Sequence, residues 1–305
     1  MIANDSKARR GFVWGVLATV IVVVAIGFGW RAFTQPAPVP EPSPTTSADP
    51  TPSVAPSPSV TPLPEFPSAA TTGVRPGVVL TDSGSLTIDE PGTVIEGLRV
   101  KGRIVVNADD VVIRDTLVEG GGAHYPIRIS RGVKNVLIEY VEVHNDPGGG
   151  IGIYFNSGSG TVRYANIHTA TDGIRIQADD VTIEHSYIHS LKRISGGHHD
   201  SIQIRSGANV VIRGNSLLPY VAETNDPMNA AIQIGSLTRD PLVDLRVEGN
   251  FMDGGNYTIN GGKDIESGSF VGNVFGPHAR YGIRTRMSPE IEWRDNIMAE
   301  TREPA

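Results

Sequence analysis

The chain contains no cysteine and no strongly basic segment beyond its first ten residues. None of its 305 residues is cysteine, so neither disulfide bonds nor thiol chemistry contributes to its stability or function. Its net charge at pH 7 is −7. An acidic chain without a basic patch argues against broad binding to a phosphate backbone, and we expect no nucleic-acid partner.

Helical periodicity is also missing from the larger part of the chain. Between residues 74 and 305 no window of about twelve residues carries apolar side chains at helical spacing. This absence excludes crossover helices of the βαβ kind. The segment instead contains short runs that alternate between apolar and polar residues and are rich in β-branched side chains, which predicts β-strands.

These runs repeat in a fixed register. One apolar position recurs about every 25 residues, the scale on which solenoids are recognised. A second apolar residue follows each of these anchors five positions later. The anchors are Ile95, Ile113, Ile138, Val162, Ile183, Ile212, Val247, Phe270 and Trp293. Their partners are Val100, Val118, Val143, Ile167, Ile188, Leu217, Met252, Phe275 and Met298.

A second series of strands lies between these runs, as in DGIRIQ at 172–177 and DSIQIR at 200–205. Each repeat is therefore two or three short strands joined by turns, and it cannot bury its apolar side alone. Stacking like strands on like strands, about 4.8 Å apart, buries one continuous core. An Asn column strengthens the register, because stacked Asn side chains can hydrogen-bond between repeats. It consists of Asn215, Asn250, Asn273 and Asn296, and we interpret it as structural.

With this repeat, the sequence resembles the right-handed parallel β-helices of the pectate-lyase-like superfamily. The resemblance covers residues 74–305 and implies an all-β, single-stranded right-handed parallel β-helix, a solenoid of about nine coils. A β-sandwich is the alternative, but it would not keep one register over nine repeats.

The N-terminal part predicts export. Residues 1–10 carry three basic side chains, and residues 11–30 contain no charge, which is long enough to span a bilayer. Basic residues before the span favour a cytoplasmic N-terminus. We predict an uncleaved signal anchor, with a cleaved signal peptide as the alternative. The β-helix domain is then extracellular, on a single-pass protein of the cell membrane.

Residues 31–73 predict a disordered linker. Twelve of the 22 prolines lie between Pro36 and Pro67, in a context of Ser, Thr and Ala. Such a segment prefers extended polyproline conformations and spans up to roughly 100 Å. At the other end, the charged tail AETREPA at 299–305 either covers the edge of the last coil or leaves it to a partner.

Candidate binding residues follow from aligning the second strand series on Asp172, Asp200, Ala230, Tyr257 and Tyr281. The third residue after each of these positions is polar, which predicts a polar ladder on the outer face of the sheet. The residue directly after each of these aligned positions is small. We interpret these small residues as a lane beside the polar ladder. Candidate substrate-binding residues on this face are Asp172, Arg175, His198, Gln203, Arg205, Gln233, Asn260 and Arg286.

Asp172 and Asp200 are predicted at the same position of consecutive coils. Two neighbouring carboxylates can raise one pKa, bind a cation such as calcium, or act as a glycosidase pair. The equally weighted alternative is that both are turn residues that begin a strand. No other cofactor is predicted, and no spacing resembles a zinc signature.

His198, His199 and Asp200 lie where the longest insertions converge, and insertions on a solenoid gather at its binding side. Histidine readily transfers protons near neutral pH. The side chains of His198 and His199 cannot both point the same way, so one of them is expected to be structural. We select His199 and Asp200 as catalytic candidates.

Lys263 and Arg284 form a further candidate pair. NYTINGGK, followed one coil later by YGIRTR, is similar in placement to the alginate lyase and chondroitinase branch of β-helix lyases. That resemblance implies a Lys base at Lys263 and an Arg near the leaving oxygen at Arg284. The calcium-binding carboxylates of that branch are replaced here by Asn256 and Thr258. Tyr154, Tyr220, Tyr257 and Tyr281 are candidates for stacking on sugar rings.

These observations predict a protein that binds an extended polysaccharide or cell-wall glycan. Cleavage by a lyase or hydrolase mechanism is the favoured purpose. A non-catalytic carbohydrate-binding or wall-attachment module is the first alternative, and a structural assembly protein is the second.

Overall fold

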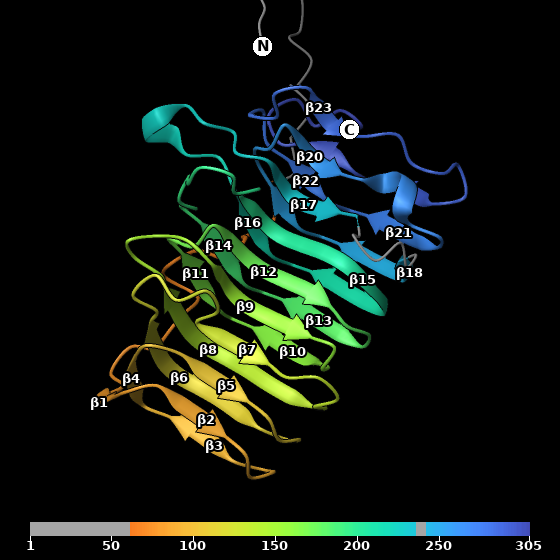
Figure 1. The fold of residues 1–305 in the computed structure, drawn as a ribbon. Coiled ribbons are helices and arrows are strands. Elements are labelled where there is room, and N and C mark those ends of the chain that lie inside the picture. Colours follow the sequence, from red (N-terminus) through yellow and green to blue (C-terminus); the bar gives the residue numbers. More distant parts are fainter. Residues whose placement is uncertain (1–61, 236–241) are drawn as a thin grey trace, which may run out of the picture. The chain divides into compact units, whose positions relative to one another are not determined.

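The computed structural model describes residues 62–235 and 242–305, which form one parallel β-solenoid (Figure 1). Every pairing between its named strands is parallel. This excludes the alternative β-sandwich, whose sheets are antiparallel. Among the described residues, no helix is long and apolar enough to cross a membrane. The predicted span at 11–30 lies outside them.

Three ladders of strands build the coils, and we assign one ladder to sheet B and two to sheet A. The strands of sheet B are β2 (Leu86–Ile88), β5 (Ile104–Val106), β7 (Ile127–Ile129), β9 (Ile151–Asn156), β12 (Asp172–Gln177), the first part of β15 (Asp200–Arg213), β17 (Ala230–Ile234), β20 (Tyr257–Asn260) and β23 (Gly282–Arg284).

The first ladder of sheet A follows sheet B in each coil. It consists of β3 (Val94–Glu96), the first halves of β6 (Val112–Glu119) and β8 (Val136–His144), β10 (Gly160–Arg163), β13 (Val181–Glu184), the end of β15, β18 (Leu242–Glu248), β21 (Gly268–Val271) and β24 (Glu292–Arg294).

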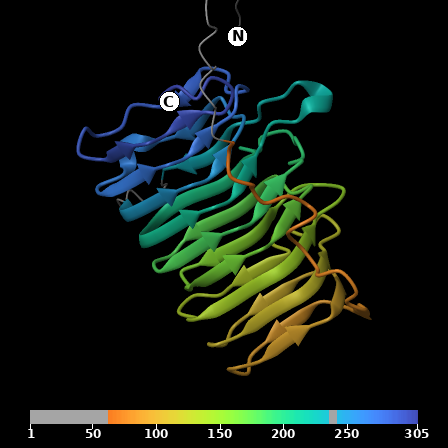
Figure 2. The same cartoon turned by 180° about the vertical axis from the view of Figure 1, so that it is seen from behind.

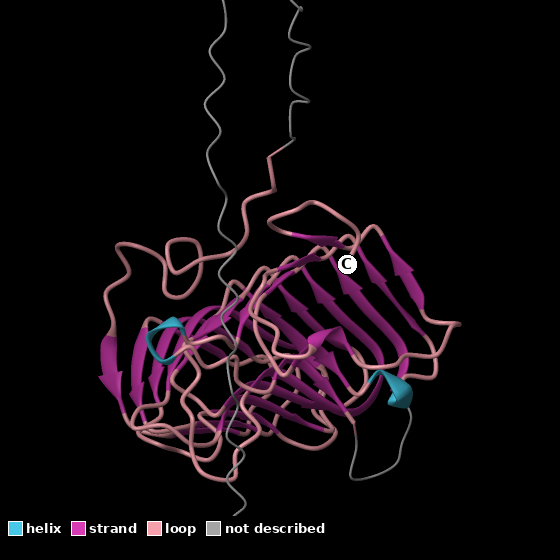
Figure 3. Ribbon diagram, turned by 90° about the horizontal axis from the view of Figure 1, so that it is seen from above, coloured by secondary structure: helices cyan, strands magenta, loops and turns pink. Residues whose placement is uncertain are grey.

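The second ladder of sheet A closes each coil. It consists of β1 (Thr81–Ser83), β4 (Leu98–Lys101), the second halves of β6 and β8, β11 (Asn166–His168), β14 (Tyr187–His189), β16 (Ser216–Leu218), β19 (Phe251–Met252), β22 (Val274–Phe275) and β25 (Ile297–Met298). Two short 3₁₀ helices, η1 (Ala222–Thr224) and η2 (Gly262–Asp264), lie at the periphery (Figure 3).

The predicted register is confirmed at every anchor. Each anchor pairs with the anchor of the next coil, from Ile95 opposite Ile113 to Phe270 opposite Trp293. The residues five positions later pair in the same way. Most of these side chains are fully buried and form one continuous core.

A single residue in the left-handed conformation separates the two ladders of sheet A. It turns the chain between strands that share one coil, and in the later coils it is often glycine, which adopts this conformation at low cost. The corner residues are Gly97, Asp115, Tyr140, Tyr164, His185, Gly214, Gly249, Gly272 and Asp295, with φ between 44° and 67°.

The Asn column follows these corners directly, and its predicted hydrogen bonds are confirmed. The amide nitrogen of Asn215 donates to Oδ1 of Asn250 over 2.9 Å. Asn250 donates to Asn273 over 3.0 Å, and Asn273 to Asn296 over 2.9 Å. All four side chains are buried. The column thus satisfies buried polar groups of adjacent coils.

Residues 62–77 pack against the solenoid, although the sequence assigns residues up to 73 to the linker. The ring of Phe66 lies 5.4 Å from that of Phe251, and the amide of Gly73 donates to the carbonyl of Tyr164 over 2.8 Å. Arg75 binds the buried carboxylate of Asp115. Figure 2 shows this segment in orange, crossing the coils toward the N-terminal end of the solenoid.

The C-terminal tail partly covers the last coil. The amide of Ala305 donates to the carbonyl of Asn296 over 2.9 Å, and the indole of Trp293 donates to the carbonyl of Ala305 over 3.0 Å. Pro304 forms an antiparallel bridge with Ile297. The tail therefore lies along part of the exposed edge, which is one of the two outcomes expected from the sequence.

Candidate binding groove

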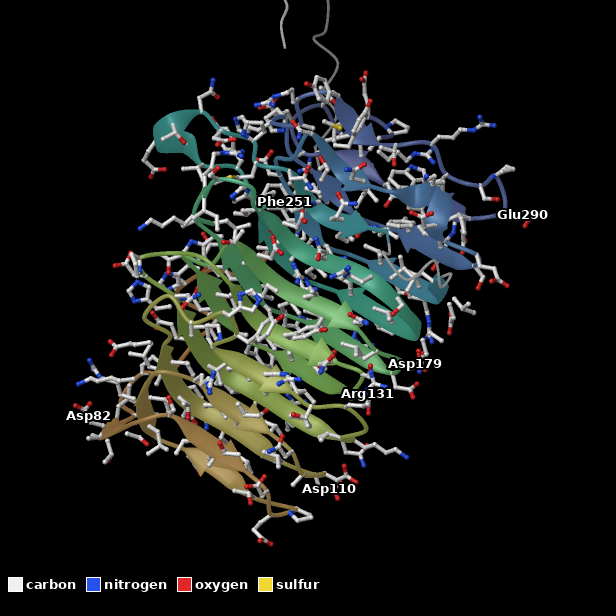
Figure 4. The ribbon with its side chains drawn as sticks, viewed as in Figure 1. Asp82, Asp110, Arg131, Asp179, Phe251 and Glu290 are labelled. Carbon is white, nitrogen blue, oxygen red and sulfur yellow. The ribbon has the colours of Figure 1, made fainter. Side chains whose placement is uncertain are left out.

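The outer face of sheet B carries a ladder of side chains in register. Apolar residues occupy alternate positions of these strands and point into the core, so the residues between them face outward. In Figure 4, Asp110, Arg131 and Asp179 mark the loops that follow β5, β7 and β12. The ladder consists of Thr87, Val105, Arg128, Tyr154, Arg175, Gln203, Gln233 and Asn260.

A groove of about 470 Å³ lies over the C-terminal half of this ladder. Seven of the residues selected from the sequence line it. They are Arg175, His198, Gln203, Arg205, Gln233, Asn260 and Lys263. The groove also includes the carboxylate residue Asp264, which follows Lys263 in η2. A second depression, of about 460 Å³, lies at the turns after sheet B and is lined mainly by small residues.

The groove has a cationic character. Arg175 donates to the carboxylate of Asp172 over 2.9 Å, so that charge is compensated. Within the described part of the chain, the side chains of Arg205 and Lys263 make no hydrogen bond or ion pair. Asp264 supplies the single carboxylate among the described lining residues. Two uncompensated cations on an acidic protein favour an anionic ligand.

Asp172 and Asp200 occupy the same position of neighbouring coils, as predicted from the sequence. The pairing of Ile174 with Ile202 sets this register. Both carboxyl groups are buried, and Asp200 has no exposed surface. Burial, followed by the neighbouring Asp172 carboxylate, raises the pKa of the Asp200 carboxyl well above its usual range. A ligand can contact Asp200 only if this region opens.

The two carboxylates do not fit a calcium site in this arrangement. Oδ1 of Asp172 accepts the amides of His199 and Asp200, over 3.1 and 3.2 Å, and Oδ2 accepts Arg175. The oxygens of Asp200 accept the side-chain amides of Asn229 and Gln203. Protein donors thus use all four oxygens that a calcium ion would need. In the described residues, no group of three His, Asp or Glu side chains is placed to hold a metal.

The two adjacent histidines point in opposite directions, as expected. His198 is exposed and lines the groove, whereas His199 is buried in a left-handed turn with φ of 65°. Nε2 of His199 accepts the backbone amide of Ile194 over 2.9 Å. Burial and the nearby Arg193 guanidinium lower the pKa of His199. The selected catalytic candidate His199 therefore holds a loop in this conformation, while its neighbour faces the groove.

Arg284 and Arg286 do not join the ladder, and the predicted register at the last coil was wrong by one residue. Tyr257 pairs with Gly282, which puts Arg284 opposite the inward Ile259. The guanidinium of Arg284 lies 4.2 Å above the ring of Trp293. No described strand pairs with β23 on its other side, Arg284 is exposed there, and a cation stacked on an aromatic ring is tolerated.

The interpretation of the small residues as part of the groove was also wrong. Ser201, Ala231 and Thr258 have no exposed surface. A Cβ atom on Gly173 would lie 2.4 Å from a methyl carbon of Ile188 in sheet A. These positions point inward at the bend where sheets A and B come together, and close packing explains their small size.

A register shift brings Arg205 out of its predicted position. Gln177 pairs with Ser206 rather than with Arg205, because a bulge interrupts the pairing of β12 with β15. The extra residue redirects the chain, as bulges commonly do. Arg205 lines the groove as predicted, although it does not pair with Gln177 as predicted.

The four candidate tyrosines lie outside the lining of the groove. Tyr154 stacks on Tyr125, with ring centroids 4.8 Å apart, and pairs in register with Arg128 on one side and Arg175 on the other. Tyr220 stacks on His278, which leaves one of its faces covered. Tyr281 is 65% exposed. Sugar stacking by these rings stays a prediction.

Sequence reasoning missed Asp264 and Asn229. Asp264 directly follows the selected Lys263, and this adjacency in the sequence could have identified it as a residue of the groove. Asn229 precedes Ala230, the aligned start of its strand, and corresponds to His199 of the preceding coil. Nothing in the repeat marks Asn229 as a partner of Asp200, because the loops that precede the strands of sheet B differ in length and sequence from coil to coil.

The fold and the groove define the chain as a right-handed parallel β-helix with a polar, cationic groove on one sheet. It belongs to the family described as "Right handed beta helix region", which matches residues 75–236, just over half of the chain. The predicted β-helix fold is thereby confirmed. No curated protein matches the sequence.

Two solved structures are similar over most of the chain. A pectin methylesterase from Yersinia enterocolitica has 9% sequence identity and a TM-score of 0.26, covering 76% of this chain and 89% of its own. The fluoroquinolone resistance protein QnrB1 has 7% identity and a TM-score of 0.19, covering 72% and 92%. At these values neither similarity bears on what this chain does.

Proposed function

We propose that the β-helix domain binds an extended anionic polysaccharide along the groove of sheet B. The observation that carries this proposal is the pair Arg205 and Lys263, which line the groove without a hydrogen-bonding or ionic partner among the described residues. A carboxylate or sulfate group of a ligand would supply the missing counter-charge through charge-assisted hydrogen bonds.

The polar ladder supports a ligand with a repeating structure. Gln203, Gln233 and Asn260 present carboxamides on successive coils, which are about 4.8 Å apart. Part of each carboxamide is used within the protein, and the groups left over are the oxygens of Gln203 and Asn260 and one N–H of each residue, which suit a chain of hydroxyl groups. A polymer lying across the coils would meet one such group at each step.

Cleavage of the bound polymer by β-elimination is a second candidate function. It is favoured because Lys263 and Arg205 both line the same groove. In this reaction the lysine amine takes the hydrogen α to a uronate carboxylate. The electron pair forms a carbon–carbon double bond as the bond to the glycosidic oxygen breaks, and that oxygen takes up a proton from water. A nearby guanidinium stabilises the charge that develops on the carboxylate. Arg205 replaces Arg284 in this proposal.

Hydrolysis is less well supported than β-elimination. A glycosidase pair needs two carboxyl groups that reach the scissile bond from opposite sides. Asp172 and Asp200 are buried, and their oxygens accept hydrogen bonds from the protein. Without cleavage, the groove serves a carbohydrate-binding or wall-attachment module, the alternative that the sequence left open.

The location of the domain remains our proposal from the sequence. The basic residues 1–10, the uncharged residues 11–30 and the proline-rich residues 31–73 are typical of a signal anchor and a spacer. We propose a cytoplasmic N-terminus and an extracellular β-helix. Protease added to intact cells should remove the β-helix domain. Full protection of the domain until the cells are lysed would contradict this arrangement.

The binding proposal is tested with polygalacturonate and alginate as anionic polymers and with dextran as a neutral one. Arg205→Ala and Lys263→Ala should each weaken binding of an anionic polymer by about tenfold, the loss expected for one charge-assisted contact. Arg246→Ala and Lys101→Ala, which remove exposed cations on sheet A, serve as matched controls. Equal binding of dextran, or equal losses in the controls, would overturn the proposal. Ultraviolet absorbance of unsaturated products reports β-elimination in the same samples.

A further inference from the structure

A chain of hydrogen bonds runs beneath the groove from a buried carboxylate to four carboxamides. Oδ1 of Asp200 accepts the side-chain amide of Asn229 over 2.6 Å, and Oδ2 accepts that of Gln203 over 3.3 Å. Asn229 also donates to Oε1 of Gln233 over 3.0 Å. Asn260 donates to the same oxygen over 2.8 Å. The chain therefore crosses three coils.

The orientation of most of these amides is fixed from the far end. Nε2 of Gln233 donates to the carbonyl of Ile234 over 2.9 Å, and a carbonyl can only accept. Oε1 of Gln233 must then face Asn229 and Asn260, so both of these residues turn their nitrogen toward it. Asn229 uses both of its N–H groups in this way, one for Gln233 and one for Asp200.

The orientation of the Gln203 amide is not fixed in this way, because within this chain of hydrogen bonds Gln203 contacts Asp200 alone. A carboxylate has no hydrogen to donate, so Gln203 must turn its nitrogen toward Asp200. This leaves Oε1 of Gln203 directed away from Asp200, on a residue that lines the groove. An acceptor at this place suits a hydroxyl hydrogen of a sugar.

We infer that Asp200 is a positioning residue that sets the polarity of Gln203 in the groove, and that a proton on Asp200 reverses it. Asn229 continues to need an acceptor at Oδ1, so the proton must sit on Oδ2 and point toward Gln203. Gln203 then turns its oxygen to Asp200 and its NH₂ group to the groove. The groove exchanges an acceptor for a donor at one point while its shape stays the same. The ligand whose binding would respond to this change is the polysaccharide of the proposed function, and this part of the inference rests on that function.

The charges around Asp200 make the proton uptake accessible. The Asp172 carboxylate faces Asp200 from β12, and the Arg175 guanidinium, on the same strand, opposes it. Burial and Asp172 raise the pKa of Asp200, whereas the amides of Asn229 and Gln203 and the charge of Arg175 lower it. The raising effects outweigh the lowering ones, so Asp200 takes up its proton above the usual range of an aspartate.

The test measures the Gln203 side chain by NMR in ¹⁵N-labelled protein, with its NH₂ signals assigned by their loss in Gln203→Glu. At pH values at which Asp200 of the wild type is ionised, the NH₂ hydrogens of Gln203 and Asn229 both point at Asp200. They should then show a mutual nuclear Overhauser effect. Asp200→Asn mimics the protonated form, since its own NH₂ can donate to Gln203. The variant should lose this effect, and Asp110→Asn, at an exposed turn, should keep it.

A titration of the wild type gives the same answer without relying on the folding of a variant. As the pH falls, the Gln203 signals should shift with a midpoint above the ordinary aspartate value of 3.8, and the effect to Asn229 should disappear over the same range. Persistence of that effect below the titration of Asp200 would overturn the inference, as would its persistence in Asp200→Asn.

The outcome is separate from that of the binding proposal. Reversal of Gln203 without binding of any polysaccharide would uphold this inference and reject the proposed function. Where alginate or polygalacturonate does bind, Asp200→Asn should change its affinity by about tenfold, the range of one buried hydrogen bond. Binding that is unaltered, with Gln203 unturned, would reject the inference alone.

Discussion

Asn250 lies in the middle of the Asn column and makes four hydrogen bonds. Its nitrogen donates to the carbonyl of Ile212 over 2.9 Å and to Oδ1 of Asn273 over 3.0 Å. Its oxygen accepts the backbone amide and the side-chain amide of Asn215, both over 2.9 Å. The residue has no exposed surface. All four bonds connect groups that water does not reach in the folded chain.

Asn250→Ala removes these bonds and leaves their partners behind. The side chains of Asn215 and Asn273 can turn, but the backbone amide of Asn215 and the carbonyl of Ile212 are held by the coils. Each buried group without a partner costs about 1–3 kcal/mol. Two such groups, together with the small cavity, should lower the free energy of unfolding by about 3–5 kcal/mol.

The measurement is urea unfolding of the purified protein, followed by far-ultraviolet circular dichroism. Asn107→Ala serves as the control, because Asn107 is exposed and bonds only to exposed side chains. The control should stay within about 0.5 kcal/mol of the wild type. A loss below about 1 kcal/mol in Asn250→Ala would refute the reasoning, since it would mean that the column contributes little to holding the coils together.

Two further predictions concern packing and pH. Gly173→Ala should lower the free energy of unfolding by about 1–3 kcal/mol, because its Cβ has no room at the bend between the sheets; Gly84→Ala, which enters open space, should have little effect, and equal urea midpoints would contradict the inward assignment. Burial and the neighbouring His168 lower the pKa of His189 from 6.5 to about 4, so the unfolded chain takes up a proton first and stability should fall as the pH drops from 6.5 to 4. An unscreened shift of this size corresponds to about 3 kcal/mol, which partial exposure reduces to about 1–2 kcal/mol. Thermal unfolding of His189→Gln should show a pH dependence weaker by this amount, and an unchanged dependence would count against it.

The core could be predicted from the sequence because the repeat enforces it. An inward position must be apolar in every coil, since it packs against the same position above and below. Nine such positions in register, from Ile95 to Trp293, leave one alignment that places all of them in or against the core. The Asn column obeys the same rule, because an unpaired amide in the core would be costly.

The outer face could be predicted only where it follows the repeat. Gln203, Gln233 and Asn260 line the groove at their expected positions, since they alternate with buried isoleucines. The prediction went wrong at Gly173, where a small side chain fits both an open groove and a crowded bend. Periodicity alone does not distinguish these two environments.

The end of the solenoid shows a different limit. YGIRT at 281–285 shares the letters GIR with DGIRI at 172–176, and the pattern therefore favoured an outward Arg284. The register instead slips by one residue, and Arg284 stacks on Trp293. An inward cation is costly within the stack, but Arg284 is exposed. The repeat predicts a position well only where strands pair with it on both sides, and among the described strands β23 pairs on one side alone.

The chemistry of the groove depends on the places where the repeat is interrupted. Arg205 lies beside a bulge, Lys263 and Asp264 lie in a 3₁₀ turn, and Asn229 ends the irregular loop between β16 and β17. A regular ladder supplies identical polar groups at equal spacing, which suits many hydroxylated polymers equally well. Charge at one point and a buried carboxylate behind one amide are what would distinguish one polymer from another. We therefore expect substitutions at the interruptions to change ligand preference, whereas substitutions in the regular ladder should lower affinity for all ligands alike.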